Sequence, residues 1–398
     1  MNRVEVVVPG DVDDPRRPSG GNVYDRRLCR ELGATGWTVH EHAVPGRWPR
    51  PRPGDLAALR AVVAGLPAGA IVLVDGLVAC CTPEVLLPHA ERLRLVVLVH
   101  QLLVDALPAR SAAATAVGEK EGAVLRAAEA VVVTSGWTRD RALHRHGLDP
   151  ARLHLAEPGC DPSPLAAGTA SGGRLLCVGV VAPHKGQDVL LAALERTDSS
   201  AWGCTFVGNL DHDRPFVGRL ERRVAAAGLG PRVRFTGALT GPALAEHYAR
   251  TDLLVVPSRA ESYGMVAAEA MAHGIPALVS DVGGLPATIG RGNPAGPAGM
   301  VVPPGDARAL ASALHEWLTE PALRERLRDA AHHRGRHLST WPATAGKIAL
   351  ALQGAPPAAP TALAPATTAA RMERSDSAAE EPGQTTERSG SAAEELRP

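Results

Sequence analysis

The chain has 398 residues, of which 45% are hydrophobic, 21% charged and 3% aromatic, and its formal net charge at pH 7 is +0. This length allows two domains with a sizeable core, and the composition is typical of a globular protein. The neutral charge and the few aromatic residues give no reason to expect binding to nucleic acid or strong attraction to an anionic membrane.

The apolar runs and the cysteines give the first expectations about location. The longest apolar runs, such as IVLV and LVVLV, have the length of a strand, and none approaches the roughly twenty residues of a transmembrane helix. The six cysteines have no CxxC spacing, which argues against a zinc or thioredoxin-like site. We therefore expect reduced thiols, a cytoplasmic protein and no transmembrane segment, while peripheral contact with a membrane stays open.

The first half of the chain alternates apolar strand segments with helical segments. Val4–Val8 is an apolar run apart from Glu5, as in a buried parallel strand. After a long loop, Ser19 and two glycines lead into a helix expected from about Asn22 to Gly33. Further strands are predicted at 36–44, 70–74, 95–100 and 130–134, and further helices at 56–65 and 119–128. This alternation is typical of a parallel α/β sheet.

Two features of this half point to a ligand. Gly20 and Gly21 stand at the first strand-to-helix turn, where the absence of side chains lets a ligand meet backbone N–H groups. The pattern GxGxxG is absent, which argues against an ordinary dinucleotide site. His100 ends a predicted strand, at the edge where open α/β sheets bind ligands. Because a single histidine is more often structural, both roles stay open on this evidence.

The second half repeats the alternation after a linker. Residues 162–173 are rich in Pro, Gly, Ser and Ala, and we place a domain boundary there. The segment RLLCVGVVAPHKGQDVLLAAL then predicts strand, loop and helix, with Lys185 just ahead of the helix. An ammonium group there can neutralise a departing diphosphate, although most lysines are solvated surface residues. From about Gly354 the apolar periodicity ends, and the repeats ERSDSAAEE and ERSGSAAEE indicate a disordered tail.

Two short acidic patterns raise the question of a metal ion. Residues 11–13 and 211–213 have the DxD form that holds a divalent metal in other transferases. Both lie in polar loops, and patterns of two residues are frequent by chance. We therefore expect no metal site and no cofactor.

The stretch Pro257–Asp281, PSRAESYGMVAAEAMAHGIPALVSD, carries the most specific pattern. A polar loop follows the apolar strand DLLVVP, a helix is expected from near Gly264 to Gly274, and the strand ALVS comes next. N–H groups at a helix start bind anions, and Gly264 leaves room for a phosphate. Glu261 precedes the helix and Glu269 lies inside it, so that one can face a sugar and the other a vicinal diol. This arrangement indicates a site for a nucleotide-diphosphate sugar, although two Glu at this spacing also occur by chance.

The frame E-S-Y-G-M-V-x-x-E-A-M-A-x-G-I-P at 261–276 resembles the donor-binding motif of the family 4 retaining glycosyltransferases (glycosyl transferases group 1). The frame VGxxxxxKGxDxLLxAL at 178–194 resembles the second motif of that family. The likeness covers roughly residues 1 to 353, and it is specific in the second half and loose in the first. It implies an α/β protein of the GT-B fold, with two Rossmann-like domains that face each other across a cleft and a last helix that crosses back.

On this likeness the chain divides into four parts. They are an acceptor-side domain at 1–165, a donor domain at 166–340, a returning helix at 341–353 and a disordered tail at 354–398.

The resemblance also assigns roles to single residues. In the family the second Glu of the motif holds the nucleotide ribose and the first contacts the donor sugar, which implies these roles for Glu269 and Glu261. Lys185 matches the cation beside the diphosphate, and His100 matches a histidine in the cleft. The implied catalytic residues are Lys185, Glu261 and His100. The implied donor-binding residues are Gly20, Gly21, Lys185, Glu261, Tyr263, Gly264, Met265 and Glu269.

The chain departs from the family pattern at one position. The family has Arg directly after the first Gly of the motif at 178–194, where it gives the diphosphate a second cation, and this chain has Val180. Either another cation replaces the arginine, with His184 and Arg259 as candidates, or the leaving group is stabilised less.

These observations predict a retaining, metal-independent glycosyltransferase that moves a sugar from a nucleotide-diphosphate sugar to a hydroxyl acceptor of undetermined identity. The resemblance implies a same-face mechanism in which the leaving phosphate takes the acceptor proton. Because a fold does not fix function, two alternatives stay open. One is a nucleotide-sugar epimerase of the same fold, and the other is a non-catalytic donor-binding subunit, which Val180 favours.

Overall fold

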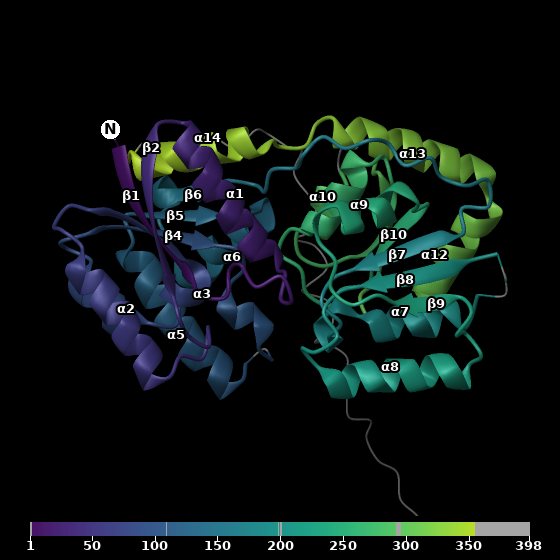
Figure 1. The fold of residues 1–398 in the computed structure, drawn as a ribbon, viewed down its shortest axis with the longest axis horizontal. Coiled ribbons are helices and arrows are strands. Elements are labelled where there is room, and N and C mark those ends of the chain that lie inside the picture. Colours follow the sequence, from purple (N-terminus) through teal and green to yellow (C-terminus); the bar gives the residue numbers. More distant parts are fainter. Residues whose placement is uncertain (1, 109, 198, 200, 292–295, 355–398) are drawn as a thin grey trace, which may run out of the picture. The chain divides into compact units, whose positions relative to one another are not determined.

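Two parallel sheets form the framework of the protein (Figure 1). The structure is a computed structural model that describes residues 2–108, 110–197, 199, 201–291 and 296–354. Within these residues there are two six-stranded sheets, and every strand pair in them is parallel. Helices return the chain from the end of one strand to the start of the next, as parallel pairing requires.

The first sheet has the strand order β2-β1-β3-β4-β5-β6. Its strands are β1 (Asn2–Pro9), β2 (Trp37–Val44), β3 (Ile71–Asp75), β4 (Arg94–Val99), β5 (Ala130–Val133) and β6 (Leu153–Leu155). Its helices are α1 (Gly20–Ala34), α2 (Pro53–Gly65), α3 (Gly76–Ala79), α4 (Pro83–Leu86), η1 (Leu87–His89), η2 (Leu103–Ala106), α5 (Ala112–Ala127), α6 (Gly136–His146) and η3 (Pro150–Arg152).

The second sheet has the strand order β12-β11-β10-β7-β8-β9. Its strands are β7 (Arg174–Val178), β8 (Gly203–Val207), β9 (Val233–Phe235), β10 (Leu253–Val256), β11 (Ala277–Ser280) and β12 (Gly299–Val302). Its helices are η4 (Pro183–Lys185), α7 (Gln187–Leu194), α8 (Arg214–Ala226), α9 (Gly241–Ala249), α10 (Met265–Ala272), α11 (Leu285–Thr288), α12 (Ala307–Thr319) and α13 (Pro321–Gly335).

Each sheet is covered by helices on both faces. In β1, Val4 and Val6 pack on the side of α1, whereas Val7 packs on the side of α2 and α5. In the second sheet, one core contains α7, α8 and α12, and the other contains α9, α10 and α11. A strand between two helical layers exposes neither face, which explains why the central strand segments are largely apolar, whereas the edge strand β2 is partly exposed.

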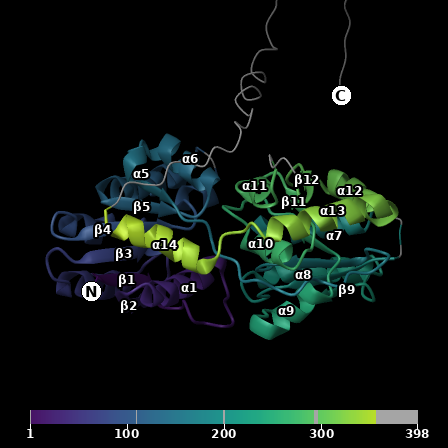
Figure 2. The ribbon, with the colours of Figure 1, turned by 90° about the horizontal axis from the view of Figure 1, so that it is seen from above.

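The last helix, α14 (Trp341–Leu352), joins the core of the first half. Trp341 and Ile348 are buried in the same cluster as Val4 and Tyr24, and the rings of Tyr24 and Trp341 meet edge to face at 5.5 Å. Figures 1 and 2 both show α14 beside α1. The prediction that the last helix crosses back to the first half is therefore confirmed.

Three observed elements differ from the predictions. Helix α5 begins at Ala112 rather than near 119, because the side chain of Ser111 caps it by accepting a hydrogen bond from the N–H of Ala114. Helix α2 begins at Pro53 rather than 56, since proline is compatible with the first helical turn. The segment after β11, for which no element is predicted above, contains the short helix α11.

The predicted domain boundary lies in a segment without regular structure. Residues 156–173, between β6 and β7, contain no helix or strand, and the whole of this segment is described. The boundary between 165 and 166 itself stays a prediction. Of the predicted tail, only Gly354 belongs to the described part, and residues 355–398 lie outside it.

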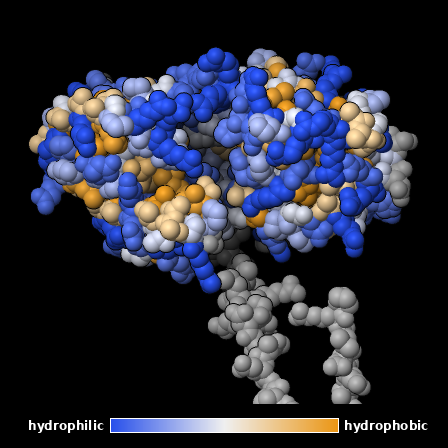
Figure 3. Space-filling view, turned by 90° about the horizontal axis from the view of Figure 1, so that it is seen from below, coloured by the Kyte–Doolittle hydropathy of each residue, from blue (hydrophilic) through white to orange (hydrophobic). Residues whose placement is uncertain are grey.

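The helices and the surface bear on the membrane prediction. None of the helices in the described part of the chain combines the length and the apolar character that a bilayer crossing needs. The exposed large hydrophobic side chains there belong to separate segments, namely Val23, Leu87, Leu165 and Leu350. Figure 3 shows one face, on which apolar residues lie among hydrophilic ones. All six cysteines are free thiols, as expected.

Candidate functional site

The predicted cation and the first predicted carboxylate are in direct contact. Lys185 is the last residue of η4, and Glu261 lies in the loop before α10. The Nζ of Lys185 donates a hydrogen bond of 2.6 Å to Oε2 of Glu261, and the two side chains are 24% and 16% exposed. The fold therefore brings together two predicted residues that are far apart in the sequence. A bound anion would accept hydrogen bonds from this ammonium group, either together with Glu261 or in its place.

Close backbone contacts fix the two loops that carry this pair. Gly186 has φ of 70°, and a Cβ there would lie 2.0 Å from the carbonyl oxygen of Pro257. Only glycine permits both the angle and this approach. The N–H of Arg259 donates to the carbonyl of His184 at 2.8 Å, and its guanidinium donates to both oxygens of Asp188 at 2.8 and 2.7 Å. Of the two candidate substitutes for the missing arginine, Arg259 is thus engaged, whereas His184 is exposed.

The start of α10 has no side-chain cap among the described residues. Gly264 has φ of 90°, and a Cβ there would lie 2.4 Å from Cδ2 of Leu285. No side chain caps this helix, so its first N–H groups keep no side-chain partner within the described residues. Gly283, which the sequence analysis did not single out, packs against Glu261, since a Cβ there would lie 1.5 Å from the carbonyl oxygen of Glu261. The two consecutive glycines at 283–284 are the sequence feature that could have indicated this close packing.

The second predicted carboxylate has a partner that sequence reasoning missed. The hydroxyl of Tyr248, from α9, donates a hydrogen bond of 2.7 Å to Oε2 of Glu269 in α10. Burial raises the pKa of Glu269, and this hydrogen bond opposes that effect in part. Glu269 lines a cavity of about 210 Å³ together with Tyr248, Leu244, Met265 and Trp341. Tyr248 lies outside the two motifs, where nothing in the sequence marked it as functional.

The remaining predicted donor-binding residues lie around the start of α1 and of α10. A Cβ at Gly20 would lie 3.1 Å from Sδ of Met265, and a Cβ at Gly21 would lie 3.1 Å from Cδ2 of His100. The first turn of α1 therefore packs between Met265 and His100. Tyr263 is buried, and its carbonyl accepts a hydrogen bond from the hydroxyl of Thr288. The donor-binding role of Tyr263 stays a prediction.

His100 is held by two buried carboxylates. Its Nε2 lies 2.9 Å from Oδ1 of Asp25 and 3.4 Å from Oδ2 of Asp75. Burial lowers the pKa of His100, but the two carboxylates outweigh it and raise that pKa to about 10. Within the described residues, these three side chains are the one group of His, Cys, Asp and Glu with metal-donor atoms within 4.8 Å of one another. Asp25 lies inside a predicted helix, and nothing in the sequence pattern there indicated a contact with His100.

The carboxylates of the two DxD patterns have partners in the protein. Those at 11–13 pair with Arg17 and Arg26. Those at 211–213 pair with Arg214 and cap α8. Each carboxylate thus has a local structural role.

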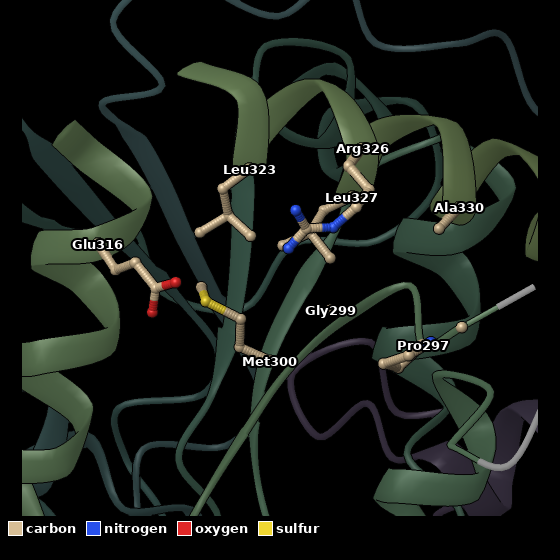
Figure 4. Close-up of a pocket in the computed structure, with 9 residues that line it drawn as sticks. Pro297, Gly299, Met300, Glu316, Leu323, Arg326, Leu327 and Ala330 are labelled. Atoms are coloured by element: carbon tan, nitrogen blue, oxygen red, sulfur yellow. The ribbon is translucent and has the colours of Figure 1, made fainter. Parts of the chain in front are cut away.

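A second cavity lies away from these residues. It has a volume of about 230 Å³ and lies between β12, α12 and α13 (Figure 4). Figure 4 shows the side chains of Met300, Glu316, Leu323 and Arg326 at this cavity. It is lined by none of the predicted site residues, and we assign no role to it.

Known proteins resemble the second half most clearly. Residues 172–334 match the family described as glycosyl transferases group 1. The D-inositol 3-phosphate glycosyltransferase of Jonesia denitrificans is 30% identical over 220 residues, which are 50% of this chain and 51% of that protein. The mannosylfructose-phosphate synthase of Agrobacterium fabrum is 28% identical over 249 residues, which are 58% of this chain and 54% of that protein. The chain thus spans about half the length of the curated relatives it matches.

Solved structures resemble the whole described chain. The sucrose-phosphate synthase (tll1590) of Thermosynechococcus elongatus is 26% identical, with a TM-score of 0.73 over 89% of this chain and 98% of that chain. Alr3699/HepE of Anabaena, in complex with UDP-glucose, has a TM-score of 0.69 at 16% identity over 89% of this chain and 100% of that chain. The second likeness is one of fold alone.

Proposed function

The chain has the GT-B fold and its residues 172–334 belong to the glycosyl transferases group 1, and from this premise we propose that it transfers a sugar from a nucleotide-diphosphate sugar to a hydroxyl acceptor, with retention of anomeric configuration. The observation that carries the proposal is the Lys185–Glu261 pair beside the uncapped start of α10. A cation, a carboxylate and free helix N–H groups together suit a diphosphate that is joined to a sugar.

The proposed pose follows from these positions. The diphosphate binds at the start of α10 and draws the ammonium of Lys185 away from Glu261. The freed carboxylate of Glu261 accepts hydrogen bonds from the donor sugar. Glu269 binds the ribose diol, and the apolar side chains of Leu244 and Met265, which line the same cavity as Glu269, lie beside the base.

In the proposed reaction no side chain of the protein forms a covalent bond with the sugar. The acceptor hydroxyl attacks from the face that the leaving group vacates, and a phosphate oxygen of the leaving group takes its proton. Lys185 and the helix N–H groups stabilise the charge that develops on the diphosphate. We propose that neither a metal nor a cofactor takes part.

The acceptor depends on the first half of the chain, which lies outside the matched residues 172–334. Loops of that half are expected to select it. Two relatives are named for phosphate-bearing compounds, D-inositol 3-phosphate and mannosylfructose phosphate. Phosphorylated polyols therefore belong among the first acceptors to test.

The test is a screen of nucleotide-diphosphate sugars against a panel of polyols and phosphorylated polyols. Release of nucleoside diphosphate reports turnover, and the anomeric proton signal of the product reports configuration. Chelator should leave turnover unchanged. Lys185→Ala should abolish most turnover, and Lys120→Ala, which changes an exposed lysine of α5, is the matched control. Product of inverted configuration, or turnover that needs added magnesium or manganese, would refute the corresponding part of the proposal.

One specific observation favours a second function. Val180 removes a cation that the family uses, so a subunit that binds the donor without turning it over is the rival. It would bind nucleoside diphosphate in calorimetry and release none from any donor. An epimerase would instead convert the sugar nucleotide without acceptor.

A further inference from the structure

The buried side chains of Asp25, Asp75 and His100 would carry a net negative charge if all three were ionised. Asp25 comes from α1, Asp75 ends β3, and His100 follows β4 (Figure 1). The two carboxylate side chains are 2% and 5% exposed. No Lys or Arg side chain of the described residues forms an ion pair with them. Two ionised carboxylates and one imidazolium would leave a net negative charge in an apolar interior, which is costly.

The hydrogen bonds distinguish the two carboxylates. Asp75 accepts a hydrogen bond from the N–H of Leu77 in addition to its contact with His100, and these contacts keep its pKa low despite burial. Asp25 contacts His100 through Oδ1, but its Oδ2 is buried and has no hydrogen-bond partner within the described residues. Burial is the main cause that raises the pKa of Asp25 to about 7. A proton on this carboxyl group would remove the excess charge.

The other titratable neighbours do not alter this balance. Tyr24 and Cys29 come from α1, and burial raises the pKa of each. Cys80 follows α3, and burial raises its pKa as well. All three side chains are therefore neutral near pH 7. The edge of the Tyr24 ring meets the His100 ring at 5.1 Å and adds no charge.

The imidazole has one nitrogen left for a ligand. Nε2 is directed at the two carboxylates, and Nδ1 forms no hydrogen bond with any described residue. The His100 side chain is 19% exposed, and the Cδ2 edge of its ring lies against Gly21, next to the glycine that faces Met265. Nδ1 lies on the other edge of the ring. The free nitrogen is therefore turned away from Gly21, on a ring that packs against the first turn of α1, beside Met265 of α10.

We propose that Asp25 and Asp75 are positioning residues that share one proton, hold His100 as an imidazolium and leave its Nδ1–H to donate to an oxygen of the bound nucleotide sugar. This inference rests on the proposed function. It gives the site a second fixed positive charge, which comes from the first half of the chain. In the family this second charge comes from an arginine at the position of Val180. Each carboxylate has a distinct part: Asp75 supplies the negative charge, and protonated Asp25 supplies the second acceptor for Nε2–H.

The test uses three variants and two readouts. The variants are Asp25→Asn, Asp75→Asn and the double variant. An asparagine at 25 imitates a protonated carboxyl group, and an asparagine at 75 lets Asp25 ionise in its place. Each single variant therefore keeps one negative charge beside His100. The double variant keeps none, so burial then favours the neutral ring.

The first readout is the ¹⁵N spectrum of labelled histidine in the protein without ligand, which is independent of activity. We expect His100 to be doubly protonated at pH 6.5, below the pKa of Asp25, in the wild type and in both single variants, and largely neutral in the double variant. His154 on β6 is an internal reference, since burial lowers its pKa and it stays neutral. A neutral His100 in the wild type overturns the proposal. So does a neutral His100 in either single variant at that pH, because one ionised carboxylate would then not hold the second proton on the ring.

The second readout is the pH profile of turnover with the donor found by the screen. The wild type and single variants should be flat between pH 6 and 8. The double variant should lose about 10²-fold at pH 8, the effect of one lost charge-stabilising donor, and regain activity only as the pH falls below 6.5, where the ring is protonated again. A uniform loss at every pH would indicate a purely structural role and refute the proposal. If the double variant does not fold, His100→Gln should show a similar loss at all pH values, and full activity in it refutes the proposal.

A metal site is the rival explanation of the same three side chains. Calorimetry with Zn²⁺ and with Mn²⁺ on chelator-treated wild type decides it. We expect no binding that depends on Asp25 and Asp75. Binding that the double variant loses would overturn the shared proton.

Discussion

Replacement of Lys185 by alanine tests the proposed donor site most directly. The ammonium of Lys185 has one observed partner, Glu261, and we propose that it changes partner when the diphosphate binds. Alanine removes the cation and leaves the carboxylate of Glu261 facing the place of the diphosphate. The variant should therefore lose the stabilisation of the leaving group and gain a repulsion.

The magnitudes follow from the exposure of the pair. Hydrogen bonds between charged groups contribute about 1.5–3 kcal/mol when sheltered, and surface ion pairs about 0–1 kcal/mol. With 24% and 16% exposure the pair lies between these cases, so Lys185→Ala should lower the free energy of unfolding by about 1–2 kcal/mol. Loss of one charge-stabilising donor should lower turnover by about 10²–10³-fold.

The assay combines steady-state release of nucleoside diphosphate with calorimetry of the diphosphate product. Glu261→Gln in the Lys185→Ala background should recover about tenfold in diphosphate affinity, because it removes the repulsion. Lys185→Arg should recover little, since a planar guanidinium does not replace a compact ammonium. Lys120→Ala should match the wild type. If folded Lys185→Ala keeps near wild-type turnover and affinity, the diphosphate binds elsewhere and the reasoning fails.

Four further predictions concern neighbouring positions. Val180→Arg should tighten nucleoside diphosphate binding in calorimetry, and unchanged affinity would show that position 180 does not face the phosphates. Glu269→Ala should weaken the same binding by about 1.5–3 kcal/mol, and Tyr248→Phe by less, because the tyrosine only orients the carboxylate; equal losses would place Tyr248 on the ligand. Gly264→Ala should lower the free energy of unfolding in denaturant by about 2–4 kcal/mol, since it combines a φ of 90° with a clash, and wild-type stability would contradict this. The pKa of His100 rises on folding from 6.5 to about 10, so its stabilising effect is complete below about pH 6.5 and is lost as pH rises toward 10. The difference in melting temperature between wild type and His100→Gln should therefore shrink over that range, and a constant difference would refute it.

The strands, the helices and the two motifs could be predicted without the structure. Apolar runs of strand length that alternate with helices specify parallel sheets, because a strand buried on both faces must be apolar throughout. Gly264 and the Lys and Glu residues of the two motifs could be singled out for a similar reason, since each belongs to a local pattern of loop and helix. The fold, the return of α14 and the likeness to the glycosyl transferases group 1 therefore followed from sequence. The roles of single residues stay predictions.

The pairings between distant residues were decided only by the tertiary structure. Asp25, Asp75 and His100 meet because β3 and β4 are neighbours in the sheet and α1 packs over it, and no periodicity in the sequence encodes that strand order. The contact between Tyr248 and Glu269 likewise depends on how α9 packs against α10. Sequence periodicity determines which face of an element is buried, whereas strand order and helix packing determine which polar groups meet there. The charge of His100 is set by those meetings, so only the folded chain determines it.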